Sequence, residues 1–111
     1  MQNLPSMHVH IDDITPKIIA PGFHGHYVHG DSMTMGKVLI ESGAVLPEHS
    51  HIHEQITLVW EGELELTIGG ETRLFGAGDV VVIPSNAVHS GVARTACMVI
   101  DVFSPVREDY R

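Results

Sequence analysis

The chain has 111 residues and a mass of 12.1 kDa, the size of one small domain. Hydrophobic residues make up 43% of it and charged residues 18%, which is the composition of a globular protein and not of a disordered one. Six Lys and Arg against 14 Asp and Glu give a formal charge of −8, which argues against nucleic acid or an anionic membrane as a partner.

Two further absences in the sequence narrow the class of protein. A single cysteine excludes an intramolecular disulfide and a thiolate zinc site, and Cys97 itself has no evident base beside it that would make it a nucleophile. No apolar run is long enough to cross a bilayer, and the N-terminus lacks a signal-peptide pattern. We therefore expect a soluble, cytoplasmic protein.

Short apolar segments alternate with Gly, Pro and Asn turns along the chain. Residues 1–16 are expected to be irregular apart from a short extended piece from Met7 to Ile11. Beyond them no window has the 3.6-residue apolar period of a helix, and Gly69-Gly70 is a typical two-residue hairpin turn. Strands are predicted over residues 35–41, 56–60, 63–68, 72–75, 80–83, 88–93 and 97–103. This pattern predicts an all-β sandwich or small barrel.

Histidines are unusually frequent, with nine in the chain, and several of them alternate along one segment. In an extended chain the side chains of His49, His51, His53 and Gln55 would share one face. His89 follows the predicted turn at Pro84 and lies in a later strand. Three imidazoles and one amide oxygen that converge inside a barrel would hold a divalent first-row metal and leave positions open for water or substrate. The alternative is a solvated histidine-rich loop.

Glycine and proline recur at set distances around these histidines. One block reads G(X)5HXH(X)3Q(X)6G from Gly43 to Gly62, and another reads G(X)5P(X)4H from Gly78 to His89. Each glycine and the proline fall at a predicted turn between strands. A chance cluster of histidines in a loop would not require this arrangement.

Both blocks resemble the two motifs of the cupin superfamily, G(X)5HXH(X)3–4E(X)6G and G(X)5PXG(X)2H(X)3N. The chain departs from them at Gln55, where Glu is usual, at Asn86 in place of Gly and at Ala93 in place of Asn. The resemblance implies a jelly-roll β-barrel with a metal site. It implies a single cupin domain over residues 1–111, with an irregular arm at 1–16 and a tail at 104–111. Cupins support many chemistries, so the motifs do not specify the reaction.

Gln55 changes what such a site can do. Because it is neutral, a site made of His49, His51, His89 and Gln55 leaves the full charge of the cation to polarise a bound hydroxyl or carboxylate. It also lacks the carboxylate that many oxygen-activating cupins use, which argues against a dioxygenase. Alternatively, Gln55 is only a hydrogen-bonding wall residue. The site predicts one divalent transition metal, and it suits Ni, Mn, Fe, Co and Zn alike.

A carboxylate interrupts the last apolar segment. Burying an unpaired Asp101 would be costly, so it should be paired, hydrogen-bonded or facing a wet cavity, and Phe103 shares its side of the strand. Arg107 is one of only six cations in the chain, and its planar guanidinium suits a carboxylate ligand. The alternatives are a structural Asp101–Arg pair and a solvated tail around Arg107.

The ending DVFSPVREDY at residues 101–110, together with the HXHXXEQ segment that begins at His49, resembles the pectin-degradation cupins known as KdgF. This resemblance implies a homodimeric, metal-dependent isomerase. Such proteins convert the cyclic 4,5-unsaturated monouronates of pectin or alginate breakdown into the linear keto form. It implies metal ligands at His49, His51, Gln55 and His89, catalytic roles for Asp101 and Arg107, and substrate contacts at Phe103 and Arg107.

Other functions fit the same motifs. They are a non-catalytic sugar- or metal-sensing cupin, a metal-dependent dioxygenase of a small organic acid, and a sugar or sugar-phosphate isomerase. His24, His26 and His29 alternate in a short segment that would line the cavity or form an edge strand. Trp60 is expected in the core or an interface. So small a sandwich exposes sheet edges, which predicts dimerisation through the N-terminal region.

Overall fold

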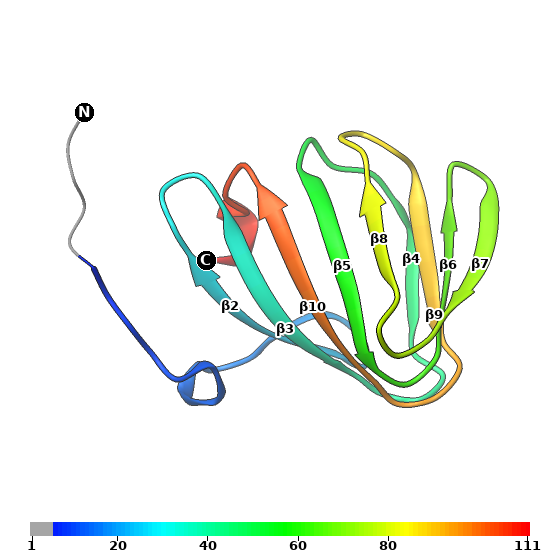
Figure 1. Cartoon of the computed structure of the whole chain (residues 1–111), viewed down its shortest axis with the longest axis horizontal. Helices are drawn as coiled ribbons and strands as arrows, with labels where there is room; N and C mark the ends of the chain where they lie inside the picture. Colours follow the sequence, from blue (N-terminus) through cyan, green and yellow to red (C-terminus); the bar gives the residue numbers. More distant parts are fainter. Residues whose placement is uncertain (1–5) are drawn as a thin grey trace.

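The computed structural model describes residues 6–111, which form ten strands and two short 3-10 helices (Figure 1). The first five residues of the expected N-terminal arm lie outside this range. In chain order the elements are η1 (Ile11–Asp13), β1 (Lys17–Ala20), β2 (Phe23–His29), β3 (Thr34–Ile40), β4 (Val45–His49), β5 (Glu54–Glu61), β6 (Leu64–Ile68), β7 (Glu71–Phe75), β8 (Val80–Ile83), β9 (His89–Ala93), β10 (Cys97–Ser104) and η2 (Glu108–Tyr110).

The strands form two antiparallel sheets that face each other across the interior. The six-stranded sheet has the order β1-β2-β3-β10-β5-β8, and the four-stranded sheet has the order β4-β9-β6-β7. Figure 1 shows the two sheets converging at one end and spreading apart at the other. This is the all-β jelly roll that the sequence predicts. Neither 3-10 helix in residues 6–111 is long or apolar enough to cross a membrane.

Side chains alternate strictly on the strands of the six-stranded sheet. On β3 and β10 every second residue is buried in the interior, and the residues between them face outward. The buried residues of both sheets meet in one hydrophobic cluster, which contains Phe23, Tyr27, Val38, Ile40, Val59, Leu64, Leu66, Ala93, Cys97, Val99 and Phe103. This alternation selects which polar side chains reach the interior as well.

Seven of the strands were expected from the sequence, β2 only as one alternative, an edge strand, and β1 and β4 not at all. In the structure β1 lies at the edge and β2 lies between β1 and β3. β1 has only four residues, β4 contains Pro47, and β2 carries Gly25 among its histidines, so each of them gives only a weak strand signal in the sequence. Hydrogen bonds to neighbouring strands stabilise these three strands. The expected extended piece at Met7 to Ile11 is not a strand, because residues 6–10 have no regular structure and Ile11 begins η1.

The N-terminal segment lies against the outer face of β2 and β3. The His26 ring nitrogen Nδ1 lies 2.8 Å from the backbone carbonyl of Ile14, and Lys37 Nζ donates to Asp12 at 2.8 Å. These contacts bury His26 on the outer face, so it does not line the interior. His24, beside it, pairs with Glu41 at 3.0 Å.

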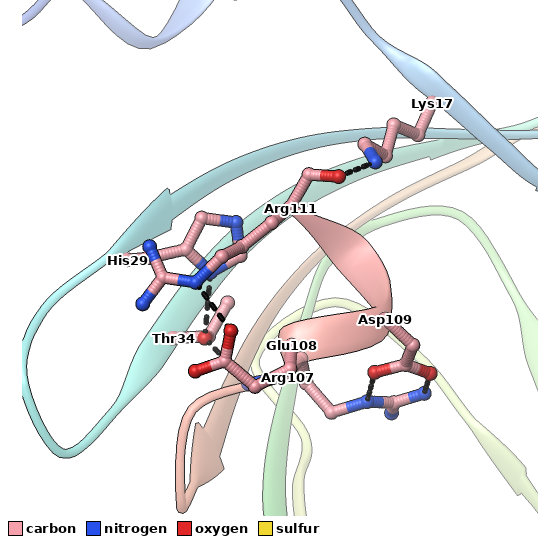
Figure 2. Close-up of polar contacts among 7 residues, drawn as sticks. All are labelled: Lys17, His29, Thr34, Arg107, Glu108, Asp109 and Arg111. Atoms are coloured by element: carbon pink, nitrogen blue, oxygen red, sulfur yellow. Dashed lines mark hydrogen bonds and ion pairs between the residues drawn. The ribbon is translucent and has the colours of Figure 1, made fainter.

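The C-terminal residues 105–111 fold back onto the six-stranded sheet (Figures 1 and 2). The backbone N–H of Arg107 donates to Thr34 Oγ1 at 2.9 Å, and Lys17 Nζ donates to the carbonyl of Arg111. The Tyr110 ring packs 4.7 Å from the ring of Tyr27. The expected polar tail is therefore a folded part of the barrel opening.

Two glycine turns show where backbone conformation constrains the fold. Gly70, in the β6–β7 hairpin, has φ of 83° and open space around it. Gly62, between β5 and β6, has φ of 90°, and a Cβ there would lie 2.2 Å from the Ala96 carbonyl oxygen. Only glycine satisfies both the conformation and the contact at position 62.

We expect Gly62→Ala to lower the free energy of unfolding by about 2–4 kcal/mol, because the left-handed backbone and the clash with Ala96 both oppose a methyl group. Gly70→Ala carries only the conformational cost of about 1–2 kcal/mol and is the matched control. Urea unfolding followed by circular dichroism measures both values. Equal losses in the two variants would contradict the steric argument.

Candidate functional site

Three histidines meet at the opening of the barrel. His49 is the last residue of β4 and pairs directly with His89, the first residue of β9, while His51 follows in the connection to β5. One ring nitrogen from each lies within 4.8 Å of the others. The ring centroids of His49 and His89 are 4.2 Å apart, and those of His51 and His89 are 4.9 Å apart. The sequence-predicted histidines 49, 51 and 89 therefore form one cluster.

The reason for this convergence differs from the one that the sequence suggested. Residues 50–53 do not continue a strand, so alternation does not place His51. The connection is held instead by the β8–β9 loop: the Asn86 backbone N–H donates to the His51 carbonyl at 2.7 Å, and the Ser85 hydroxyl donates to the Ile52 carbonyl. Asn86 has a left-handed backbone with φ of 66°, at the motif position where glycine is usual.

Backbone carbonyls orient all three rings in the same way. The Nδ1 atoms of His49, His51 and His89 donate to the carbonyls of Pro47, His53 and Ala87 at 2.9, 3.0 and 2.8 Å. Because a carbonyl only accepts, Nδ1 carries the proton, and each Nε2 keeps a free lone pair. His51 Nε2 is buried without a hydrogen-bond partner. Three imidazoles in this tautomer fit a divalent transition metal.

The electrostatics of the cluster keep two of its rings neutral. Burial, with the Arg107 charge as a smaller cause, lowers the pKa of His51 to about 4. Burial also lowers the pKa of His89, against the opposing hydrogen bond to the Ala87 carbonyl. Neutral imidazole is the form that binds a metal.

Gln55 lies beside the histidines on the inner face of β5. Its amide Nε2 donates to Thr57 Oγ1 at 2.9 Å and reaches Asp101 Oδ1 at 3.4 Å. The amide nitrogen is thus engaged by Thr57, which leaves the carbonyl oxygen Oε1 as the atom that Gln55 can offer to a metal. Thr57 was not singled out from the sequence, although it lies two residues from Gln55 and shares its face of the strand.

Asp101 is buried next to Gln55 and Thr57. The Thr57 hydroxyl donates to Asp101 Oδ1 at 2.6 Å, and Asp101 has a 7% exposed surface. Burial raises the pKa of Asp101 to about 6, although hydrogen bonds from Thr57 and Gln55 act in the opposite direction. The expectation of a hydrogen-bonded Asp101 is confirmed. The alternative of a structural Asp101–Arg pair is wrong, because Arg107 pairs with Asp109.

Asp101, Thr57, Gln55 and His89 line one cavity in the barrel interior. The rest of its wall is apolar and comes from both sheets, including Val38, Leu64, Leu66, Ile83 and Val99. A carboxylate, an amide and an imidazole are therefore presented to an otherwise apolar space. Such an arrangement of few polar groups in an apolar pocket is typical of a small-molecule site.

Phe103 and Arg107 lie at the rim beside the histidines. The Phe103 ring meets the His51 ring edge-on at 6.0 Å between centroids, and the Arg107 guanidinium lies 4.7 Å from the Phe103 ring centroid. Arg107 is only 5% exposed. The alternative of a solvated tail around Arg107 is therefore wrong, because packing of the C-terminal turn buries the residue.

The remaining histidines have other surroundings. His53 lies near the cluster, with its ring 5.4 Å from that of His51, and its Nδ1 is buried without a partner. His29 hydrogen-bonds to Thr34 at 2.9 Å. Trp60, expected in the core or an interface, is 57% exposed, so it is not a core residue.

Two facing antiparallel sheets with a histidine cluster at their open end define the cupin class of protein. The Cupin domain family matches residues 36–103, and the chain belongs to this family. That range contains the three clustered histidines, Gln55 and Asp101.

Within the cupins, the chain is similar to proteins named KdgF. The chain is 35% identical over 104 residues to the pectin degradation protein KdgF of Dickeya dadantii. The alignment covers 90% of this chain and 94% of that protein. It is 31% identical to the structure of KdgF from Halomonas sp., with a TM-score of 0.84 over 96% of this chain and 98% of the other. An RmlC-like cupin from Shewanella frigidimarina is 27% identical, with a TM-score of 0.89 over 96% and 97% of the two chains.

If the cluster binds a metal, we expect His51→Ala to weaken that binding by at least about 100-fold, since even losing a partner that orients a ligand costs about 10–100-fold. Metal content of purified protein, measured by inductively coupled plasma mass spectrometry, checks this. His24→Ala is the control, because His24 pairs with Glu41 away from the cluster. Equal metal content in both variants would place the metal elsewhere.

Proposed function

We propose that this protein is a metal-dependent isomerase that opens the ring of 4,5-unsaturated monouronates to the linear keto form, in the breakdown of pectin or alginate. The similarity to two KdgF proteins over nearly the whole chain carries this proposal. A buried carboxylate beside three convergent imidazoles supports it. The substrate is a small anionic sugar, and its carboxylate requires well-placed hydrogen-bond donors on a chain whose net charge is −8.

The metal ligands in this proposal are His49, His51, His89 and Gln55. The three free Nε2 lone pairs and the amide oxygen Oε1 are the atoms that would hold a divalent cation. When bound, such an ion acts as a Lewis acid that orients substrate oxygens and acidifies a hydroxyl. The neutral ligand set leaves the charge of the ion undiminished.

Asp101 moves the proton in this reaction. It removes the proton of the anomeric hydroxyl, the bond between C1 and the ring oxygen breaks, and its electron pair passes to the ring oxygen. Return of the proton at C4 converts the resulting enolate to the ketone, so the product is an isomer and no redox cofactor is needed. Thr57 and Gln55 both bind Oδ1, which leaves Oδ2 for the substrate.

Arg107 and Phe103 hold the substrate. A guanidinium at the rim offers paired donors to a planar carboxylate, and the flat ring of Phe103 packs against the sugar face. Both lie beside the histidine cluster, so the carboxylate would be bound while the anomeric end lies near Asp101. Fixing the substrate in this way lowers the entropic cost of reaching the transition state.

We expect Asp101→Asn to lower the catalysed rate by about 10²–10⁴-fold, because the amide cannot accept and return the proton. The assay follows loss of ultraviolet absorbance of freshly generated 4,5-unsaturated galacturonate above its spontaneous rate. Metal content should remain that of the wild-type protein. Asp13→Asn, an exposed aspartate of η1, is the matched control.

Three results would contradict the proposal at different points. Wild-type protein with full metal content and no acceleration would reject ring opening and favour a sugar- or metal-sensing cupin. Full activity in Asp101→Asn would reject its proton-transfer role. Oxygen uptake in the same assay would favour a dioxygenase.

We further propose that the protein is a homodimer. The sequence suggested pairing through the N-terminal region, whereas the exposed apolar side chains of the structure favour the outer face of the six-stranded sheet. Ile56, Trp60 and Val82 on this face are 44%, 57% and 54% exposed, and Met35 and Leu39 are exposed beside them. The cross-strand register places Met35, Val102, Ile56 and Val82 in one row. A contiguous apolar face of this kind is typical of a self-complementary interface.

We expect Ile56→Asp to dissociate the dimer, since a twofold interface would bury two copies of the unpaired charge. Light scattering after gel filtration should change from twice the 12.1 kDa chain mass to the chain mass itself. Leu74→Asp is the control, because Leu74 is 56% exposed on β7 of the other sheet. A monomeric wild-type protein, or a dimeric Ile56→Asp variant, would contradict this interface.

A further inference from the structure

The carboxylate of Asp109 forms an ion pair with one edge of the Arg107 guanidinium. Arg107 Nε donates to Oδ1 at 3.0 Å and Nη2 donates to Oδ2 at 2.9 Å, so the contact is bidentate and side-on (Figure 2). The side chain of Arg107 is 6% exposed, whereas that of Asp109 is 58% exposed. The aspartate therefore approaches from the solvent side of a nearly buried cation.

Two aromatic rings fix the guanidinium from other directions. Its central carbon lies 3.8 Å from the centroid of the Tyr110 ring and 4.7 Å from that of Phe103. Stacking on aromatic rings restricts rotation of the guanidinium plane, and the bidentate pair restricts its tilt. Arg107 is therefore held in one orientation before any ligand arrives.

The Asp109 contact uses only part of the hydrogen-bonding capacity of the guanidinium. Arginine has five N–H donors in a fixed fork, and Asp109 uses one on Nε and one on Nη2. Of the donors that remain, one N–H on Nη2 and one on Nη1 point in the same direction and form the end-on fork that matches a planar carboxylate. The second N–H of Nη1 lies on the opposite edge.

The C-terminal turn, which contains both Arg107 and Asp109, is anchored to the rest of the fold. Arg107 is anchored through its backbone N–H to Thr34, and the turn closes with Glu108 accepting from Arg111 Nε at 2.7 Å. Lys17 binds the carbonyl of Arg111 and holds the end of the chain (Figure 2). The support for Arg107 is thus part of the folded C-terminus and not of a loose tail.

We propose that Asp109 is a positioning residue, which fixes Arg107 side-on so that the free end-on fork of its guanidinium binds the carboxylate of a uronate. This inference rests on the proposed function, because it takes the ligand to be a uronate. Asp109 also neutralises the charge of Arg107. This pair of residues, which we call the clamp, therefore selects a carboxylate by the geometry of its hydrogen bonds more than by net charge. The pKa shifts agree with a tight pair: Arg107 lowers the pKa of Asp109, and Asp109 raises that of Arg107 against the effect of burial.

The experiment compares binding of D-galacturonate, a saturated uronate, to the Ni²⁺-loaded full chain by isothermal titration calorimetry. We expect Asp109→Asn to weaken binding about tenfold, as losing one charge-assisted interaction of about 1.4 kcal/mol would do. Asp109→Glu should recover part of the loss, because it restores a carboxylate. Glu108→Gln is the matched control in the same turn, since Glu108 pairs with Arg111 and not with Arg107.

Two further measurements separate positioning from a general structural effect. The Arg107 Nε–H resonance, assigned by its absence in Arg107→Lys, should be slow to exchange in the wild type and fast in Asp109→Asn. In the ring-opening assay, Asp109→Asn should raise KM about tenfold and change kcat less than about twofold, because the interaction acts on ground state and transition state alike.

Unchanged affinity and unchanged exchange in Asp109→Asn would overturn the inference. Tighter binding would also overturn it, because Asp109 would then compete with the ligand for Arg107. No galacturonate binding by the wild type would reject Arg107 as the carboxylate receptor. A wild type that binds galacturonate through this pair and does not accelerate ring opening would reject the proposed function and leave the clamp standing.

Discussion

The structure depends on the register of β10, which pairs with β3 on one side and β5 on the other. Its odd-numbered residues, including Asp101 and Phe103, face the interior, and the even-numbered residues Ile100 and Val102 face outward. A slip of one residue would exchange the two faces, because side chains alternate along a strand. The same pairing thus supplies a buried carboxylate to the cavity and apolar side chains to the outer face of the sheet.

Hydrogen bonds orient the polar side chains that this register brings inside. Backbone carbonyls hold the three imidazoles through Nδ1, and Thr57 holds both Gln55 and Asp101 through one hydroxyl. At the rim, Asp109 and two aromatic rings hold Arg107. Each group that we assign to metal, proton or carboxylate is therefore restrained by a neighbour, and such restraint reduces the reorganisation that binding and catalysis require.

The sequence predicted much of the fold and the histidine cluster, and the exceptions have physical causes. Strands with β-branched or alternating composition were predicted to within two residues at each end, and the strand at 80–83 was predicted with correct bounds. β4 was missed and β2 was expected only as an alternative, because Pro47 and Gly25 are poor strand residues and neighbouring strands stabilise these two strands. His51 reaches the cluster although alternation does not place it, because backbone bonds from the β8–β9 loop hold its connection. Arg107 was expected to suit a carboxylate, but its partner Asp109 was not foreseen.

By itself the sequence determined the all-β class, the turns at Gly69-Gly70 and Pro84, and the spacing of histidines that the cupin family shares. These are local properties, since turn conformation and strand alternation depend on neighbouring residues. Tertiary structure decided which atoms face one another: the convergence of His49 and His51 with His89, the Thr57–Asp101 hydrogen bond between β5 and β10, and the hydrogen bond that anchors the Arg107 backbone to Thr34. Such contacts join residues far apart in the chain, and their geometry exists only once the sheets have paired and closed.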